Sequence, residues 1–336
     1  LKNYNPDTIA QNFNITSKQS LEKIAAQEAD NFTTVSEITA RECEQFLGKP
    51  VDIVTPNGFQ DFIENKKNFP KKQKEGRKKL TDVAEAILGY PLDSNALLVG
   101  TSGRYEFKNK GIDVFIKALG KLNKDESVTR EIAAFILIPA GHQGPVPELL
   151  NNLSHKENHT PLPNPYTTHI LNNPEYDPVL QAIKENNLLN TENDRVKIFF
   201  VPSYLNGNDG VFDTPYYHLL TGLNLSVFPS YYEPWGYTPL ESVAFKVPTI
   251  TTTLAGFGLW VETHYKKEKP GITVIKRTDT SDEEVINQIA DNIIRHAGYN
   301  EKEAQKVSEN AFEISKIALW DNLISYYLES YDNALQ

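Results

Sequence analysis

The chain has 336 residues, of which 39% are hydrophobic and 23% are charged, the proportions of a globular protein that can bury a core. Its 34 basic and 44 acidic residues give a net charge of −10, which argues against a protein that coats nucleic acid or an anionic membrane surface, so we expect neither as a partner. The single cysteine, Cys43, excludes an intramolecular disulfide and a cysteine-built zinc site, and it suits the reducing cytoplasm in which we expect the protein to act.

Apolar runs rich in β-branched and aromatic residues alternate with segments of helical period, which predicts an α/β fold with a parallel sheet. The strands are expected at 51–55, 96–101, 133–139, 196–202, 225–229, 248–252 and 272–275. The helices are expected at 111–121, 176–187, 215–222, 238–245, 282–296, 302–314 and 318–331. The basic stretch 66–79 predicts a solvated helix or linker, because it is short and lacks interleaved aromatic residues. Residues 140–170, rich in Pro, Asn and His, predict a long surface loop.

Two strand-end loops carry residues suited to holding an anion. In a parallel sheet, ligands bind beyond the carboxyl ends of the strands, so the residues that follow each strand matter most. The strand at 96–101 is followed by a loop that contains Arg104 and Lys110 and leads into a helix. Such a loop is more often simply solvated, but both cations would suit phosphate oxygens.

The loop after the strand at 225–229 is harder to explain as a solvent turn, because Glu233 and Glu241 stand eight residues apart around a Pro-Trp-Gly run flanked by three tyrosines. A helix that begins near Thr238 would leave the amides of Gly236, Tyr237 and Thr238 free to bind an anion. We therefore predict a diphosphate site between the two loops. No divalent metal is expected there, since the sequence has no Asp-x-Asp pair at a strand end and no His cluster with metal spacing.

These residues lie in a longer resemblance. The run PSYYEPWGYTPLE, followed by VPTITTTLAGFG, resembles the signature of glycosyltransferase family three, the fungal and animal type of glycogen synthase, and we expect a bacterial member. The resemblance extends to FTTVSEITARE, VTPNG, GRYEFKNKGIDVF, DRVKIFF and a closing W-x2-L-x2-YY pattern, so it covers nearly the whole chain. It implies a GT-B arrangement of two Rossmann-like domains. Residues 1–60 would be the C-terminal remnant of the N-terminal domain, 61–310 the nucleotide-sugar-binding domain, and 311–336 a helix that packs back toward the N-terminal domain.

The resemblance implies a role for each matched residue. Arg104 and Lys110 would neutralise the donor pyrophosphate, Glu233 would lie at the transferred glucose, and Glu241 would lie at the nucleotide ribose. Tyr216 would place its ring against the uracil, although a core tyrosine is an equal alternative. The other substrate-binding residues that the resemblance implies are Trp235, Gly236, Tyr237, Thr238 and Lys23, the last of which replaces an arginine of the family.

The implied function is a retaining transfer of glucose from UDP-glucose to the non-reducing end of an α-1,4-glucan, either glycogen or a maltooligosaccharide, with no cofactor. Because loss of one oxyanion donor costs enzymes roughly 10²–10³-fold in rate, we predict that Arg104→Ala or Lys110→Ala cripples the complete enzyme. The chain begins at Leu1 and contains no methionine, so we expect a fragment that is inactive alone.

Departures from the family pattern leave alternatives open. Ser17 and Lys18 stand where the family has a His-Arg pair. Residues 301–306 are not strongly cationic where the eukaryotic enzymes carry an arginine-rich helix, so we expect no activation by glucose 6-phosphate. A homo-oligomer stays open, as do an ADP-glucose-dependent starch or glycogen synthase and a non-catalytic nucleotide- or glucan-binding module. A dehydrogenase is disfavoured, because no Gly-x-Gly-x-x-Gly follows a strand.

Overall fold

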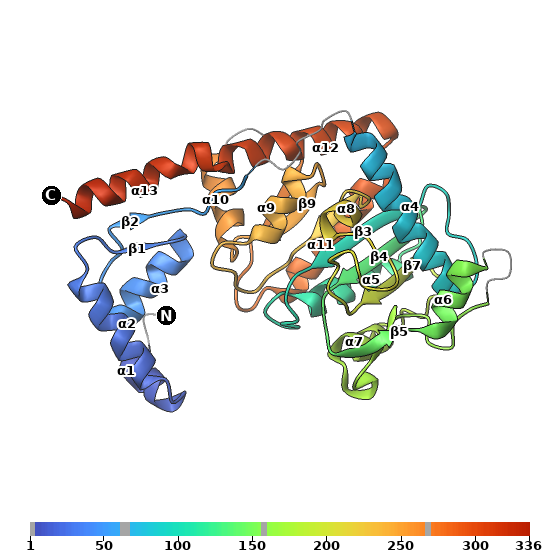
Figure 1. Cartoon of the computed structure of the whole chain (residues 1–336), viewed down its shortest axis with the longest axis horizontal. Helices are drawn as coiled ribbons and strands as arrows, with labels where there is room; N and C mark the ends of the chain where they lie inside the picture. Colours follow the sequence, from blue (N-terminus) through green and yellow to red (C-terminus); the bar gives the residue numbers. More distant parts are fainter. Residues whose placement is uncertain (1–3, 61–67, 156–159, 266–269) are drawn as a thin grey trace.

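The central sheet has six parallel strands, in a computed structural model that describes residues 4–60, 68–155, 160–265 and 270–336 (Figure 1). In spatial order they are β10 (Ile272–Ile275), β9 (Thr249–Thr252), β8 (Leu225–Val227), β3 (Leu97–Ser102), β4 (Ile132–Leu137) and β7 (Val196–Val201). Every neighbouring pair runs parallel, which confirms the predicted strands and the α/β class. The remaining predicted strand is β2 (Ile53–Val54), which pairs in parallel with β1 (Thr33–Thr34) outside the central sheet.

Helices cover both faces of this sheet. One face packs against α5 (Ile112–Lys124), α7 (Pro178–Glu185) and α11 (Asp282–Ala297). The other packs against α4 (Phe69–Leu88), α8 (Tyr216–Leu220), α9 (Tyr237–Ala244), α10 (Gly256–His264) and α12 (Glu301–Ser315). Alternate residues of one strand pack into opposite cores: Phe135 of β4 lies in the core with α4 and α9, and Ile136 lies in the core with α5 and α11. Burial on both faces explains why β4 and β7 consist almost entirely of apolar residues.

The basic stretch is more than a solvated segment. Its described part, from residue 68, begins α4, whose Phe69, Gly76 and Leu80 are buried. A Cβ on Gly76 would lie 2.3 Å from the carbonyl oxygen of His218, so the helix lies directly on α8. The helix alternative of the prediction is confirmed over the described residues, and the lysines lie on its exposed face, but the opposite face is packed in the core rather than solvated.

The prediction of a loop over 140–170 was also wrong in part. This region contains β5 (His142–Pro145), α6 (Pro147–Ser154) and most of β6 (His169–Leu171), and the two strands pair antiparallel. Buried His169 anchors the hairpin, because its Nε2 lies 2.9 Å from the carbonyl oxygen of Asp209. A short 3-10 turn, η1 (Pro174–Tyr176), follows β6. Residues 156–159 lie outside the described residues.

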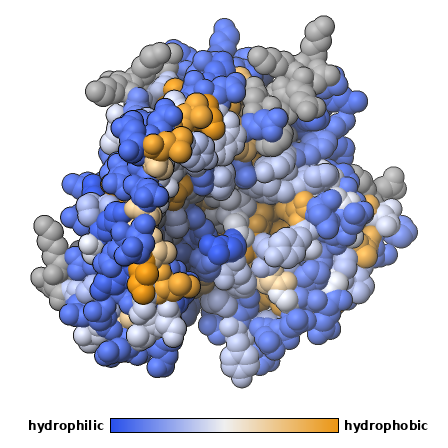
Figure 2. Space-filling model, turned by 60° about the vertical axis from the view of Figure 1, so that its left-hand side comes forward, coloured by the Kyte–Doolittle hydropathy of each residue, from blue (hydrophilic) through white to orange (hydrophobic). Residues whose placement is uncertain are grey.

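The N-terminal segment forms helices that were not predicted, α1 (Pro6–Asn12), α2 (Thr16–Glu28) and α3 (Glu37–Leu47). After η2 (Lys316–Ala318), the last helix, α13 (Trp320–Ala334), runs back along this segment (Figure 1). The Tyr327 hydroxyl donates to the carbonyl oxygen of Thr55 at 3.2 Å, and the Ser330 hydroxyl donates to Asn31 at 2.8 Å. Seen from the side of the N-terminal segment, the surface is hollowed between two lobes (Figure 2). The domain boundaries stay a prediction.

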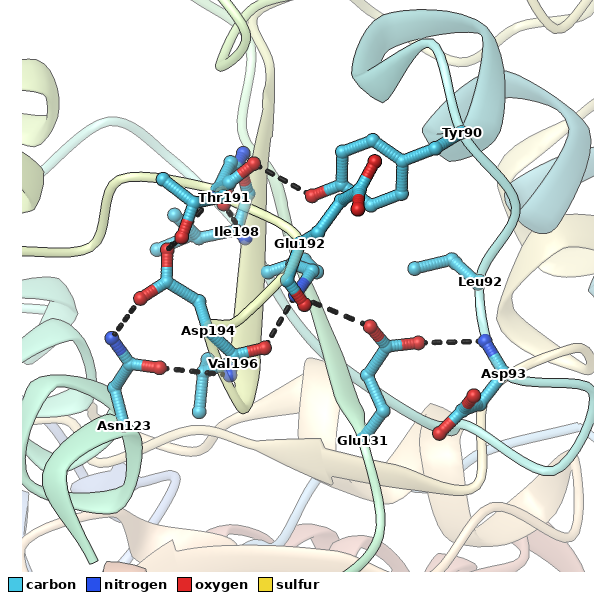
Figure 3. A network of polar contacts seen from close by, with 12 residues as sticks. Tyr90, Leu92, Asp93, Asn123, Glu131, Thr191, Glu192, Asp194, Val196 and Ile198 are labelled. Atoms are coloured by element: carbon cyan, nitrogen blue, oxygen red, sulfur yellow. Dashed lines mark hydrogen bonds and ion pairs between the residues drawn. The ribbon is translucent and has the colours of Figure 1, made fainter.

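A network of polar contacts, built around buried Lys197, fixes the amino ends of β4 and β7 (Figure 3). The ammonium group of Lys197 is fully buried and lies 3.3 Å from the carboxylate of Glu131, which also accepts from the backbone N–H of Asp93 at 2.7 Å. Nearby, the Tyr90 hydroxyl donates to the carbonyl oxygen of Asn190 at 2.7 Å. These contacts join the segment before β3 to the starts of both strands. No helix within the described ranges is long and apolar enough to cross a bilayer.

Candidate functional site

The strand order reverses between β3 and β8. From β3 the chain passes outward through β4 to β7, then returns to β8 on the other side of β3 and continues to β9 and β10. The two strands pair directly, Val99 with Leu225 and Gly100 with Ser226. In open parallel sheets the connections on either side of such a reversal leave in opposite directions and form the ligand-binding crevice at the carboxyl ends. The loops after β3 and β8 are those that the sequence singles out.

These two loops lie against each other. The ammonium group of Lys110 contacts the carboxylate of Glu233, and their side chains are only 14% and 18% exposed. The backbone N–H of Tyr231 donates to the carbonyl oxygen of Asn109 at 2.7 Å. Gly111 has a φ of 68°, and a Cβ there would lie 2.0 Å from the carbonyl oxygen of Pro229, so only glycine permits this approach. The loops therefore bring a cation and a carboxylate together at the switch point.

Helix α9 begins beside this ion pair with open amide groups. Gly236 precedes it in a left-handed conformation with a φ of 105°, and no side chain of the described residues caps the helix. Within the described part of the chain, no hydrogen bond uses the backbone N–H of Gly236, Tyr237 or Thr238, and Pro239 has none to offer. Unpaired amides and the helix dipole make such a start attractive to an anion.

Trp235 supports this turn from beneath. Its side chain is 3% exposed, and its ring centroid lies 5.8 Å from that of Phe257 and 6.0 Å from that of Trp260. The backbone N–H of Phe257 donates to the carbonyl oxygen of Trp235 at 2.6 Å. The structure thus places Trp235 in an aromatic cluster under the loop, where its ring fixes the turn. By contrast, the ring of Tyr237 is 43% exposed at the first position of the helix.

Two consecutive tyrosines of α8 reach different parts of the site. The hydroxyl of Tyr216 lies 2.7 Å from Oγ of Ser102 at the end of β3. The hydroxyl of Tyr217 donates to Oε1 of Glu241 on α9 at 2.8 Å. Burial raises the pKa of Glu241 above its ordinary value, an effect that the hydrogen bond from Tyr217 opposes. Sequence reasoning named Tyr216 and Glu241 but missed Tyr217, although its place beside Tyr216 in a very short helix was a usable signal.

Two predicted residues are not brought to the turn at 235–238. The side chain of Arg104 is 75% exposed, and its Nε pairs with Oε1 of Glu106 at 3.2 Å. Lys23 lies on α2, where its Nζ is 3.4 Å from the carboxylate of Asp7. Neither side chain has a recorded contact with the turn among the residues that the structure describes. Their phosphate roles stay predictions.

Further residues hold the loop after β8, and sequence reasoning did not find them. The guanidinium of Arg277 is buried, bonds the carbonyl oxygen of Pro229, and lies 4.8 Å from the ring centroid of Tyr231. On the other side, the Tyr232 hydroxyl donates to Oε2 of Glu42 on α3 at 2.5 Å, and burial raises the pKa of Glu42. These partners lie 46 to 190 positions away along the chain, so no local pattern announces them.

A cavity of about 1080 Å³ lies at the opposite, amino end of the sheet, lined in part by α4 and by the start of α12. Its arginines are already bonded to protein oxygens: Arg77 donates to Ala96 at 2.6 Å, and Arg130 donates to Asn95 at 2.5 Å. Over the described ranges, no group of three or more His, Cys, Asp or Glu side chains is placed to hold a metal ion.

Comparison with known proteins identifies the family. The family model described as glycogen synthase matches residues 1–150 and 148–336. The chain belongs to the glycogen synthase family. It is 29% identical to the glycogen [starch] synthase of Caenorhabditis elegans, over 100% of this chain and 59% of that protein. Isoform 2 of the Saccharomyces cerevisiae glycogen [starch] synthase is also 29% identical, over 100% of this chain and 57% of that protein. The human liver glycogen [starch] synthase is 28% identical, over 97% of this chain and 54% of that protein. The chain thus spans little more than half the length of these glycogen synthases.

Solved structures give the same fold. The catalytic domain of starch synthase IV from Arabidopsis thaliana, bound to ADP and acarbose, has a TM-score of 0.55 at 17% identity, over 93% of this chain and 57% of that one. A sucrose-phosphate synthase from Thermosynechococcus elongatus has a TM-score of 0.52 at 17% identity, over 95% of this chain and 62% of that one. Likeness at this identity shows the fold alone, and it confirms the GT-B expectation for this member of the glycogen synthase family.

Proposed function

We propose that this chain is the donor-binding half of a retaining glucosyltransferase that moves glucose from UDP-glucose to the non-reducing end of an α-1,4-glucan. The observation that carries the proposal is the contact of Lys110 with Glu233 beside the uncapped start of α9, at the point where the strand order reverses. Membership of the glycogen synthase family supports it. The acceptor in this proposal is glycogen or a maltooligosaccharide, and the location is the cytoplasm.

The proposed chemistry follows from where charge develops. Departure of a nucleoside diphosphate from glucose leaves positive charge on the sugar and negative charge on the leaving oxygens. The ammonium group of Lys110 and the free amides at the start of α9 would stabilise those oxygens, because preorganised donors act best in a partly buried site. Glu233 would lie at the glucosyl group, which its contact with Lys110 supports. Arg104, which is long and exposed, would add a second cation after leaving Glu106.

Two donors fit the same geometry. A diphosphate is common to UDP-glucose and ADP-glucose, so the phosphate-binding residues do not discriminate between them. UDP-glucose is the donor that the family resemblance of the sequence implies, whereas the structurally similar starch synthase was solved with ADP. The base would be read near Tyr216, whose hydroxyl contacts Ser102 beside the switch point.

The decisive assay uses the full-length protein that contains this chain. Glycogen is incubated with radiolabelled UDP-glucose or ADP-glucose, and label in the polymer is counted. We expect incorporation from UDP-glucose that falls by at least tenfold in Lys110→Met and stays normal in Lys108→Met, whose side chain is 75% exposed and pairs with Asp113. Incorporation from ADP-glucose alone would correct the donor. No incorporation from either, with both ligands bound, would indicate a non-catalytic module.

A further inference from the structure

The carboxylate of Glu241 is half satisfied. Its Oε1 accepts from the Tyr217 hydroxyl at 2.8 Å, and in the described segments of the chain no other side chain or backbone group bonds this carboxylate. Among the described residues no cation pairs with it, while burial raises its pKa. Such a group has one oxygen left to accept a hydrogen bond, and it repels phosphate. A ligand hydroxyl is a donor that this oxygen can accept from.

The position of Glu241 relative to the open amides matches a nucleotide. Glu241 lies four residues after Tyr237 and three after Thr238 on α9, so the three residues share one face of the helix. An anion at the helix start would therefore have this carboxylate about one turn away, along the same face. In a nucleoside diphosphate, the group next to the phosphates is a ribose, which carries hydroxyl donors.

Ring contacts hold Tyr217 in the position from which its hydroxyl bonds this carboxylate. Its ring stacks on Phe245, with centroids 4.9 Å apart and planes inclined by 19°, and the neighbouring Tyr216 ring lies 5.4 Å away. Phe245 directly follows α9, so the tyrosine spans from α8 to the end of the helix that carries Glu241. A phenylalanine would keep the stacking and lose only the hydrogen bond.

We propose that Tyr217 is a positioning residue for the donor nucleoside: it holds the Glu241 carboxylate so that the free oxygen accepts a hydrogen bond from a ribose hydroxyl. The inference rests on the proposed function, because it assigns the diphosphate to the start of α9. It adds a source of selectivity, since a site built around this acceptor favours ribonucleotides over analogues without ribose hydroxyls.

Titration calorimetry of this chain with UDP and with 2′,3′-dideoxyuridine diphosphate tests the proposal. We expect the unmodified chain to bind UDP about tenfold more tightly than the dideoxy analogue, as a hydrogen bond to a charged group allows. Tyr217→Phe should reduce that preference to about threefold or less and change the affinity for the analogue by less than about twofold. The control Tyr176→Phe, at a site 79% exposed, should bind both ligands as the unmodified chain does.

The outcomes separate this inference from the proposed function. If Tyr217→Phe keeps the full preference for UDP, or weakens both ligands equally, the positioning role is overturned while the donor site stands. If the unmodified chain binds neither UDP nor ADP, the proposed donor site fails, and the role of Tyr217 fails with it. Circular dichroism of each variant confirms that the fold is retained.

Discussion

Replacing Lys110 with methionine removes the one predicted cation that the structure places against the loop after β8. The side chain is 14% exposed, so methionine fills similar space and deletes the charge alone. A hydrogen bond to a charged group contributes about 1.5–3 kcal/mol. At about 1.4 kcal/mol for each tenfold change, Lys110→Met should weaken UDP binding by roughly 10- to 150-fold. The loss should be at the upper end, because Glu233 is then left facing the phosphates without its partner.

Titration calorimetry with UDP and with uridine separates the contribution of the diphosphate to the binding free energy from that of the nucleoside. Uridine has no phosphate, so its affinity should change by less than about twofold in Lys110→Met. Lys108→Met is the matched control: it removes the same charge two residues away, from a side chain that is 75% exposed, and it should bind UDP normally. Equal losses in the two variants would mean that only overall charge matters. A loss below threefold in Lys110→Met would refute the assignment of this lysine to the diphosphate.

Four further predictions concern stability and regulation. Lys197→Met takes the cation away from Glu131, whose side chain is 13% exposed, and should lower the free energy of unfolding in urea by about 3 kcal/mol, partly restored by adding Glu131→Gln; a loss below about 1 kcal/mol would contradict this. Tyr232→Phe removes the hydrogen bond to Glu42 and should speed amide exchange in α3 but not in α5; equal exchange rates would count against the contact. Burial lowers the pKa of His296 from 6.5 to about 4, so between these pH values the unfolded chain binds a proton that the folded chain does not. The free energy of unfolding should therefore fall by up to about 3 kcal/mol as the pH drops from 6.5 to 4, and His296→Gln should lack this contribution. Glucose 6-phosphate at millimolar concentration should leave the melting temperature unchanged, and a rise of several degrees would refute our expectation about regulation.

The central sheet and its switch-point loops could be predicted because their causes are local. Most of the six strands are rich in apolar and β-branched residues, and the helices between them show a clear period, so an α/β fold with parallel strands follows. Loops after parallel strands gather at one edge of a sheet, which was enough to predict that Lys110 would face the segment containing Glu233. Their close approach also depends on Gly111, whose positive φ is visible only in the structure.

Other features depend on contacts between distant residues. The hairpin at 140–171 pairs His142 with Leu171, and no local period reports such a partner. Helix α10 begins in a run of threonine and glycine with poor helix propensity, yet a Cβ on Gly258 would lie 2.3 Å from the carbonyl oxygen of Thr252, so close packing selects the sequence there. Arg104 turned out to pair with Glu106, a competitor only two residues away. The sequence of the loop does not show whether Arg104 pairs with Glu106 or faces the helix start.

A crystal structure of this chain with UDP would show directly whether the switch point holds the donor. We expect diphosphate oxygens within hydrogen-bond distance of Nζ of Lys110 and of the backbone N–H groups of Tyr237 and Thr238, with the ribose beside Glu241. Nucleotide bound elsewhere, with the start of α9 occupied only by solvent, would contradict it.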